Sequence, residues 1–267
     1  MTAKLWMFLW RDWVNARSYR ISFLLQNAAL LAPLVVMYFL KRTFTGVEVP
    51  TLAAYGSDYI TFIFIGIIVT VYSYSALHAF SASLRGAQMT GTLEVLLLTR
   101  ASLPEIILGW SLYPFARATA QLLIYLVSGF LVLGLAVSNA NMVGSLLVFG
   151  LGVAVMAGLG VMAAAFTLVF KQGDPFTGLI TAAAGLFSGS IFPASVLPGW
   201  LQPISQILPQ THFIEGMRLA MLQGSSLAEL SPCLGPLLAM SALLPASLIV
   251  FDQAMRRAKV EGSLAHF

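Results

Sequence analysis

Residues 59–82 read YITFIFIGIIVTVYSYSALHAFSA and contain no Lys, Arg, Asp or Glu. A helix that crosses the hydrocarbon core of a bilayer needs about 20 consecutive apolar residues. A strand of a membrane β-barrel would be only about 10 residues long and would alternate polar with apolar side chains. This stretch is too long and too uniformly apolar for such a strand, and it therefore predicts a membrane-spanning helix.

The composition of the whole chain supports the same interpretation. Of its 267 residues, 59% are hydrophobic and only 9% are charged, whereas soluble domains carry about 25% charged residues. One soluble domain of this length could not bury so much apolar surface, so the class is an all-α integral membrane protein. The single cysteine, Cys233, excludes an internal disulfide. The net charge of +4 is interpreted as membrane topology and not as nucleic-acid binding.

Six apolar segments are long enough to cross a membrane, and residues 1–267 are expected to form one transmembrane domain. The predicted spans are residues 21–40, 59–82, 106–137, 143–170, 175–194 and 233–251. Lys and Arg are more frequent in the connections that a cytoplasmic N-terminus would place inside the cell, as the positive-inside rule requires. Both termini are therefore expected in the cytoplasm, and the first span is expected to be retained and not cleaved as a signal peptide.

Two flanking segments are predicted to be helical without spanning the membrane. In residues 1–20, Trp6, Leu9 and Trp13 recur at helical spacing among basic residues, which predicts an amphipathic helix in the inner interface. In residues 195–232 and just before them, prolines recur every five or six residues, and no straight spanning helix tolerates this spacing. Because the same stretch is rich in apolar side chains, we expect short re-entrant helices in the outer leaflet; an ordinary surface loop is the alternative.

Several kinds of chemistry are missing from the chain. No lysine follows a glycine, so there is no P-loop for ATP hydrolysis, and the three histidines form no zinc-peptidase motif. The chain is therefore not expected to be an enzyme or to bind a metal or cofactor. Carriers coupled to protons or sodium ions place carboxylates within the membrane, and these spans have almost none.

Arg117 is the ionisable residue that fits least well into a spanning segment. It lies roughly 17 Å into the third span if the membrane begins at Ile106, with Gln121 one turn further on. A charge inside the membrane indicates a functional site. The alternative is that the side chain of Arg117 extends to the inner interface.

Two motifs resemble those of a known family, the membrane-spanning permease subunits of type-2 ABC exporters. The first is GTLEVLLLTRASLPEIILG at 91–109, and the second is FPASVLPGWLQPISQILPQTHFIEGMR at 192–218. The first likeness rests on Gly91, Thr92, Leu93, Glu94, Arg100 and Glu105. The second rests on Phe192, Pro193, Leu197, Pro198, Trp200, Pro209, Thr211, Glu215 and Arg218.

The resemblance implies a role for each region. Residues 84–104 would form a cytoplasmic coupling loop that docks on a separate ABC ATPase subunit, present in two copies and carrying the ATP and Mg²⁺. The second motif would form an outer gate. Two copies of this chain, or this chain and a related permease, would enclose the pathway in a bacterial-type inner membrane. The candidate pathway residues are Tyr72, Tyr74, Arg117, Gln121, Phe187 and Phe192.

Those aromatic and weakly polar side chains favour an amphipathic organic or lipid-like substrate, as in the multidrug branch of the family. A polysaccharide or glycolipid exporter shares the architecture and is the alternative within the family. An ion-coupled secondary transporter or a membrane-embedded lipid-modifying enzyme is the alternative from another class.

Overall fold

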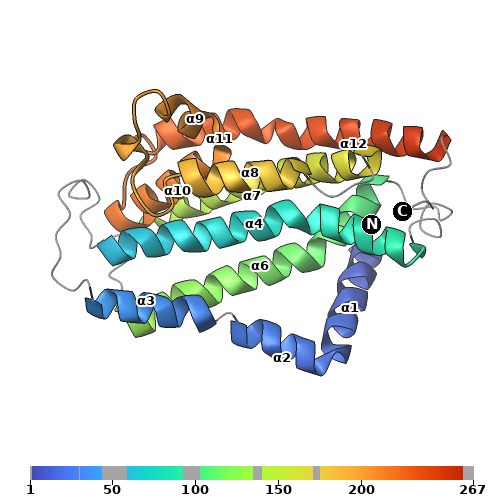
Figure 1. The fold of residues 1–267 in the computed structure, drawn as a ribbon, viewed down its shortest axis with the longest axis horizontal. Helices are drawn as coiled ribbons and strands as arrows, with labels where there is room; N and C mark the ends of the chain where they lie inside the picture. Colours follow the sequence, from blue (N-terminus) through green and yellow to red (C-terminus); the bar gives the residue numbers. More distant parts are fainter. Residues whose placement is uncertain are drawn as a thin grey trace.

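The computed structural model describes residues 2–29, 31–43, 59–92, 103–134, 140–170 and 175–260, and none of these residues lies in a strand (Figure 1). The helices before the outer segment are α1 (Thr2–Ser18), α2 (Arg20–Ala29), α3 (Leu31–Thr43), α4 (Tyr59–Met89), α6 (Leu103–Leu133), α7 (Met142–Phe170) and α8 (Pro175–Phe187). They are followed by the 3₁₀-helix η2 (Ala194–Val196), α9 (Gln202–Ile207), α10 (Pro209–Arg218), the π-helical turn η3 (Leu219–Gln223), α11 (Ser231–Ser241) and α12 (Leu243–Val260).

The long helices lie side by side along the long axis of the molecule, and α1 runs across that axis (Figure 1). Helix α7 packs against α4, α11 and α12, while α4 also packs against α6. A Cβ atom on Gly158 of α7 would lie 2.8 Å from the backbone nitrogen of Leu244. Only glycine therefore allows α7 to approach the start of α12 this closely.

The buried hydrophobic residues that the structure describes form two clusters along α4. One lies around Phe62, Tyr72 and Phe213, toward the end of the molecule that carries α9 and α10. The other lies around Phe80, Trp110 and Phe251, toward the end where α1 begins and α12 ends. Of the most apolar part of α4, 72% is buried within the protein, against 17% of the most apolar part of residues 231–258. Helix α4 is therefore the central helix, and α11 and α12 expose apolar side chains on the outside of the bundle.

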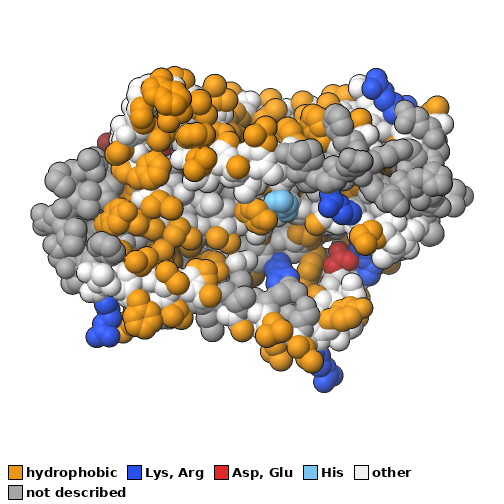
Figure 2. Space-filling view, viewed as in Figure 1, with side chains coloured by type: hydrophobic (Ala, Val, Ile, Leu, Met, Phe, Trp, Pro, Cys, Tyr) orange, Lys and Arg blue, Asp and Glu red, His pale blue; other side chains and the backbone are white. Residues whose placement is uncertain are grey.

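Within the described ranges, four helical segments are long and apolar enough to cross a membrane: residues 59–89, 105–131, 142–169 and 231–258. Hydrophobic side chains cover much of the visible surface, and most of the visible Lys and Arg side chains lie in the right half of the view (Figure 2). An apolar surface this extensive is typical of a protein that is solvated by lipid. The prediction of an all-helical, multi-pass membrane protein is confirmed.

The first and fifth predicted spans differ from these four. Residues 21–40 fall on α2 and α3, which lie on either side of Leu30, a residue outside the described ranges. Helix α8 has 13 residues and ends at Phe187, whereas the predicted span continued to residue 194. At 1.5 Å per residue α8 is about 20 Å long, less than the about 30 Å of a hydrocarbon core. Six spans, the interfacial position of α1 and the orientation of the termini remain predictions.

Candidate functional site

The segment between α8 and α11, called the outer segment here (residues 188–230), is built from short helices whose limits follow its prolines. Pro203 lies in the first turn of α9, and Pro209 is the first residue of α10. Proline suits these positions because the first backbone N–H groups of a helix have no partner within it. Gly189 has a φ of 75°, a left-handed conformation that lets the chain turn after α8.

Arg218 is the best-buried charged group among the described residues, with 1% of its surface exposed. Its Nε donates a hydrogen bond to the carbonyl oxygen of Phe62 in α4 (3.2 Å). Its two terminal nitrogens donate to the carbonyl oxygens of Gly189 and Ser190 (2.8 Å each). The guanidinium carbon also lies 3.4 Å from the centre of the Phe62 ring. One side chain on α10 therefore ties the turn after α8 to the start of α4.

The three hydrogen bonds and the ring contact stabilise the buried charge of Arg218. Hydrogen bonds from an ionised donor are roughly twice as strong as neutral ones. The planar guanidinium matches several acceptors at once and also stacks on an aromatic ring, which a lysine ammonium cannot do in the same way. Ser190 also lies just after the C-terminal end of α8. Because the helix dipole makes this end partially negative, the position further favours a cation.

Gly66 and Gln210 complete the contact between α4 and the outer segment. A Cβ atom on Gly66 would collide with the carbonyl oxygen of Ser190 and with the Arg218 guanidinium. Gln210 is buried, and its Nε2 donates to Oγ1 of Thr70 (3.0 Å), which in turn donates to the carbonyl oxygen of Gly66 (2.7 Å). The sequence analysis did not identify these residues. Gly66 and Thr70 were a visible signal of a close contact, because they stand among the bulky side chains of 59–71.

The other residues predicted for the outer gate differ in how far they are buried. Pro193 is buried and Glu215 is half-buried, whereas Pro198 and Trp200 are exposed, Trp200 to 75%. Pro209 starts α10 and is half-buried. The predicted gate residues thus include an internal anchor, Arg218, and an outward-facing apolar group around Trp200.

The predicted pathway residues are not brought together into one cavity. Tyr72 is buried, and its ring centre lies 5.0 Å from that of Phe149 and 6.4 Å from that of Phe213. Tyr74 is 51% exposed and its ring lies beside His78. Two positions apart on a helix correspond to about 200° of rotation, so the two tyrosines face opposite sides of α4.

Two further pathway candidates lie near the end of α8. Phe187 is the last residue of that helix and is half-buried. Phe192 follows in the turn before η2 and is exposed. The cavity beside Tyr74, between α4, α8 and α10, has a volume of about 40 Å³ and includes neither of them. Ligand pockets have volumes of about 300–1,000 Å³, so this cavity is too small for an organic substrate.

The predicted ATPase-docking residues are only partly described. Helix α4 ends at Met89 and is followed by a left-handed glycine, Gly91 (φ 66°), whose N–H donates to the carbonyl oxygen of Gln88 (3.1 Å). The Thr92 hydroxyl lies 2.9 Å from that of Thr90 and donates to the carbonyl oxygen of Ala87. Glu105 lies in the first turn of α6, where a carboxylate suits the helix dipole. Leu93, Glu94 and Arg100 lie outside the described residues.

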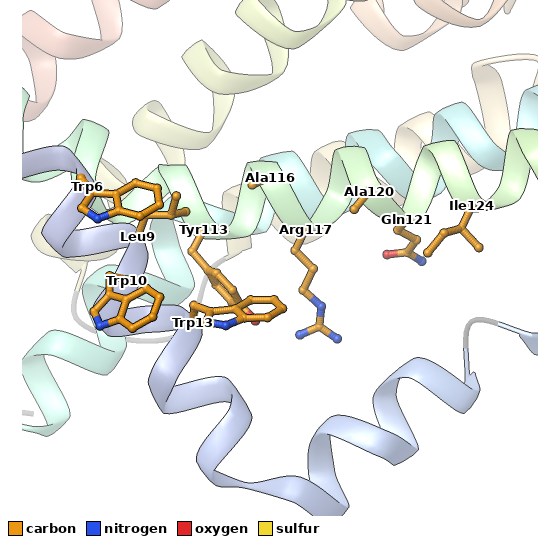
Figure 3. A pocket seen from close by; sticks show the side chains of 10 residues that line it. All are labelled: Trp6, Leu9, Trp10, Trp13, Tyr113, Ala116, Arg117, Ala120, Gln121 and Ile124. Atoms are coloured by element: carbon orange, nitrogen blue, oxygen red, sulfur yellow. The ribbon is translucent and has the colours of Figure 1, made fainter. Parts of the chain in front are cut away.

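Arg117 and Gln121 line a separate cavity of about 450 Å³ between α1 and α6. Figure 3 shows that Trp13 of α1 and Tyr113, Arg117 and Gln121 of α6 extend toward the same space. A second hollow, of about 820 Å³, adjoins it and is lined by Arg11, Asp12, Thr90 and Thr92 among others. Among the described residues, no group of three His, Cys, Asp or Glu side chains is placed to hold a metal ion.

The fold and these sites define an all-helical multi-pass membrane protein with a proline-rich outer segment anchored to its central helix. Residues 3–222 match the ABC-2 type transporter family, and the chain belongs to that family. The match includes α1, the connection between α4 and α6, and the outer segment as far as η3.

Relatives with assigned names are permeases and a nodulation protein. The chain is 28% identical over 172 residues to Nodulation protein J of Sinorhizobium fredii, which is 62% of this chain and 63% of that protein. It is 27% identical over 157 residues to the Linearmycin resistance permease protein LnrN of Bacillus subtilis (59% and 40%). It is 27% identical over 189 residues to the Probable multidrug ABC transporter permease YbhR of Escherichia coli (69% and 50%). The matched parts thus cover 40% to 63% of the length of these relatives.

Proposed function

We propose that this chain is the permease subunit of an ATP-driven exporter, which forms a dimeric pathway for an amphipathic organic or lipid-like substrate. A separate ABC ATPase in two copies supplies the energy, and its ATP and Mg²⁺ are bound outside this chain. Family membership supports the transport role. The names of the relatives refer to nodulation, linearmycin resistance and multidrug transport, and they do not agree on one substrate. The proposed substrate class therefore rests on Tyr74 and on the weakly polar side chains in the same cavity, such as Thr70 and Ser73.

One observation carries the mechanism: helix α4 connects the predicted docking loop to the outer segment. It has 31 residues and no internal proline, and is about 46 Å long. One end leads through Gly91 into the residues predicted to meet the ATPase, and the other end holds Arg218 through Phe62. A displacement of the cytoplasmic end would therefore be transmitted along α4 to the outer segment, which would open or close the exit.

The exposed side of α4 supports a pathway at an interface between two chains. The cavity beside Tyr74 is too small for a substrate, while half of the Tyr74 surface is exposed on the outside of this single chain. A second copy, or a related permease, packed near this surface would enclose a larger space. Two protomers would then each contribute one half of the pathway.

The proposed location is the inner membrane of a bacterial cell, with six spans and both termini in the cytoplasm. The start of α1 and the end of α12 lie at the same end of the molecule, as an even number of spans requires (Figure 1). Arg11 and Arg17 on α1 and Arg256 and Arg257 on α12 are exposed near that end. This distribution agrees with the positive-inside rule.

The docking role is tested by the charge reversal Glu94→Arg. The variant and the wild-type chain are co-purified with the ATPase subunit, and ATPase stimulation and ATP-dependent substrate uptake into inside-out vesicles are measured. We expect weaker association or reduced stimulation, because a cation replaces a carboxylate at the interface. The matched control is Glu48→Arg, in the predicted outer connection 41–58. Wild-type association and stimulation in Glu94→Arg would refute docking through this loop.

A further inference from the structure

The cavity between α1 and α6 has a chemical character that the proposed transport pathway does not use. Its volume of about 450 Å³ is within the range of ligand sites. Trp6, Trp10 and Trp13 line it from α1, and Tyr113, Arg117 and Gln121 line it from α6 (Figure 3). The wall is almost entirely apolar, with one guanidinium group among aromatic rings.

The cation in this cavity has no anionic partner in the part of the chain that the structure describes. Arg117 is half-buried, and no carboxylate of a described residue lies within salt-bridge distance of it. Asp12, the acidic residue of α1, instead pairs with the neighbouring Arg11 at 2.7 Å and lines the adjoining hollow. Gln121 directs its Nε2 to the hydroxyl of Tyr125 (3.2 Å) and does not neutralise the charge.

The position of the cavity relates it to the membrane interface. Helix α1 crosses α6 where Phe8 packs on Gly109, since a Cβ atom there would lie 2.7 Å from the Phe8 ring. Tryptophan rings favour the headgroup level of a bilayer. From Tyr113 to Ile124 the cavity follows α6 for about 16 Å. Its aromatic end thus lies at the level of α1, Arg117 lies next along α6, and the apolar Ile124 lies furthest from α1.

We propose that this cavity binds an anionic phospholipid from the inner leaflet. The phosphate group contacts the Arg117 guanidinium beside Trp13, and an acyl chain lies along α6 toward Ile124. The charge complementarity selects an anionic headgroup over a zwitterionic one, and the tryptophan rings contact the upper part of the acyl chains. The site is distinct from the proposed pathway beside Tyr74, and lipid binding does not depend on the export role or on an ATPase.

Tryptophan fluorescence provides a direct measurement, because three of the five tryptophans line the cavity. The full chain with Trp200→Phe, which removes an exposed outer tryptophan, is placed in phosphatidylcholine vesicles. These contain increasing fractions of dibrominated phosphatidylglycerol or dibrominated phosphatidylcholine, whose bromines quench tryptophans on contact. Trp110 is 4% exposed and contributes an unquenched background. We expect the anionic lipid to reach half-maximal quenching at a membrane fraction about fivefold lower than brominated phosphatidylcholine does. This is about the factor expected for one basic residue beside an anionic headgroup.

Variants assign that preference to Arg117. Arg117→Gln is expected to remove the fivefold difference, whereas Arg117→Lys, which keeps the charge, is expected to retain most of it. The matched control is Arg85→Gln on α4, which removes a cation that does not line the cavity. Equal quenching by both lipids in the wild-type chain, or an unchanged preference in Arg117→Gln, would overturn the proposal. Loss of the preference in Arg85→Gln would overturn it as well, because general surface charge would then explain the effect.

Discussion

Two arginines in the apolar part of this protein, Arg218 and Arg117, have opposite surroundings. Arg218 is fully buried and donates to three backbone carbonyl oxygens from two other segments. Arg117 is half-buried in an open cavity, and no described side chain or carbonyl group accepts a hydrogen bond from it. A cation at membrane depth needs acceptors. The protein provides such acceptors for Arg218, and Arg218 is therefore a structural anchor. Among the described residues it provides none for Arg117, which lines an open cavity.

The largest effect on stability is expected from replacing the anchor. Arg218→Met leaves the carbonyl groups of Gly189 and Ser190 without their donor, and each buried group left unsatisfied costs roughly 1–3 kcal/mol. We expect a total loss of roughly 3 kcal/mol or more, measured by thermal unfolding of the purified protein in detergent. Arg218→Lys should recover little of this loss, because one ammonium group cannot reproduce the planar set of donors. A lysine variant as stable as the wild-type chain would show that charge alone holds the outer segment.

An intermediate effect is expected where α4 approaches the anchor. Gly66→Ala introduces a Cβ atom that collides with the Ser190 carbonyl oxygen and the Arg218 guanidinium, and overpacking of this kind costs about 1–3 kcal/mol. The control Gly86→Ala lies on the same helix, where a Cβ atom meets no atom within 4 Å. It should be neutral or stabilise the protein by up to about 1 kcal/mol. Equal thermal stability of the two variants would contradict the close contact between α4 and the outer segment.

The smallest effect is expected at the second arginine. Arg117→Gln removes no hydrogen bond to another described residue, so the unfolding free energy should stay within roughly 0.5 kcal/mol of the wild-type value. The thermal assay used for Arg218 provides the comparison, in detergent without anionic lipid. Destabilisation comparable to that of Arg218→Met would show that Arg117 is a second internal anchor.

Much of the architecture was predictable because it depends on local sequence. An uninterrupted apolar stretch predicts a long helix, and residues 59–82 lie within α4. The prolines of the second motif predict short helices, and Pro203 and Pro209 lie in the first turns of two of them. The early end of α8 at Phe187 was less predictable, because its apolar composition continues beyond the turn at Gly189.

The sequence indicated which residues belong to the candidate sites, but not which residues each of them contacts. The resemblance identified Arg218, but its role depends on a carbonyl group 156 positions away in the sequence. Arg117 stood out as a charge in an apolar segment. Sequence reasoning left open whether it belongs to the transport pathway or extends to the inner interface, and did not connect it with the tryptophans of α1. Tyr72 and Tyr74 were grouped together, although the rotation of the helix turns them to opposite sides.

By itself, the sequence determined the helical class, the apolar character and the proline-limited shape of the outer segment, because each follows from backbone and solvation preferences of neighbouring residues. The tertiary structure alone decided which arginine is an anchor and which lines an open cavity. That difference depends on the carbonyl groups and rings that distant helices bring within hydrogen-bonding distance. A charge in an apolar stretch is visible in any sequence, but its acceptors are chosen by packing.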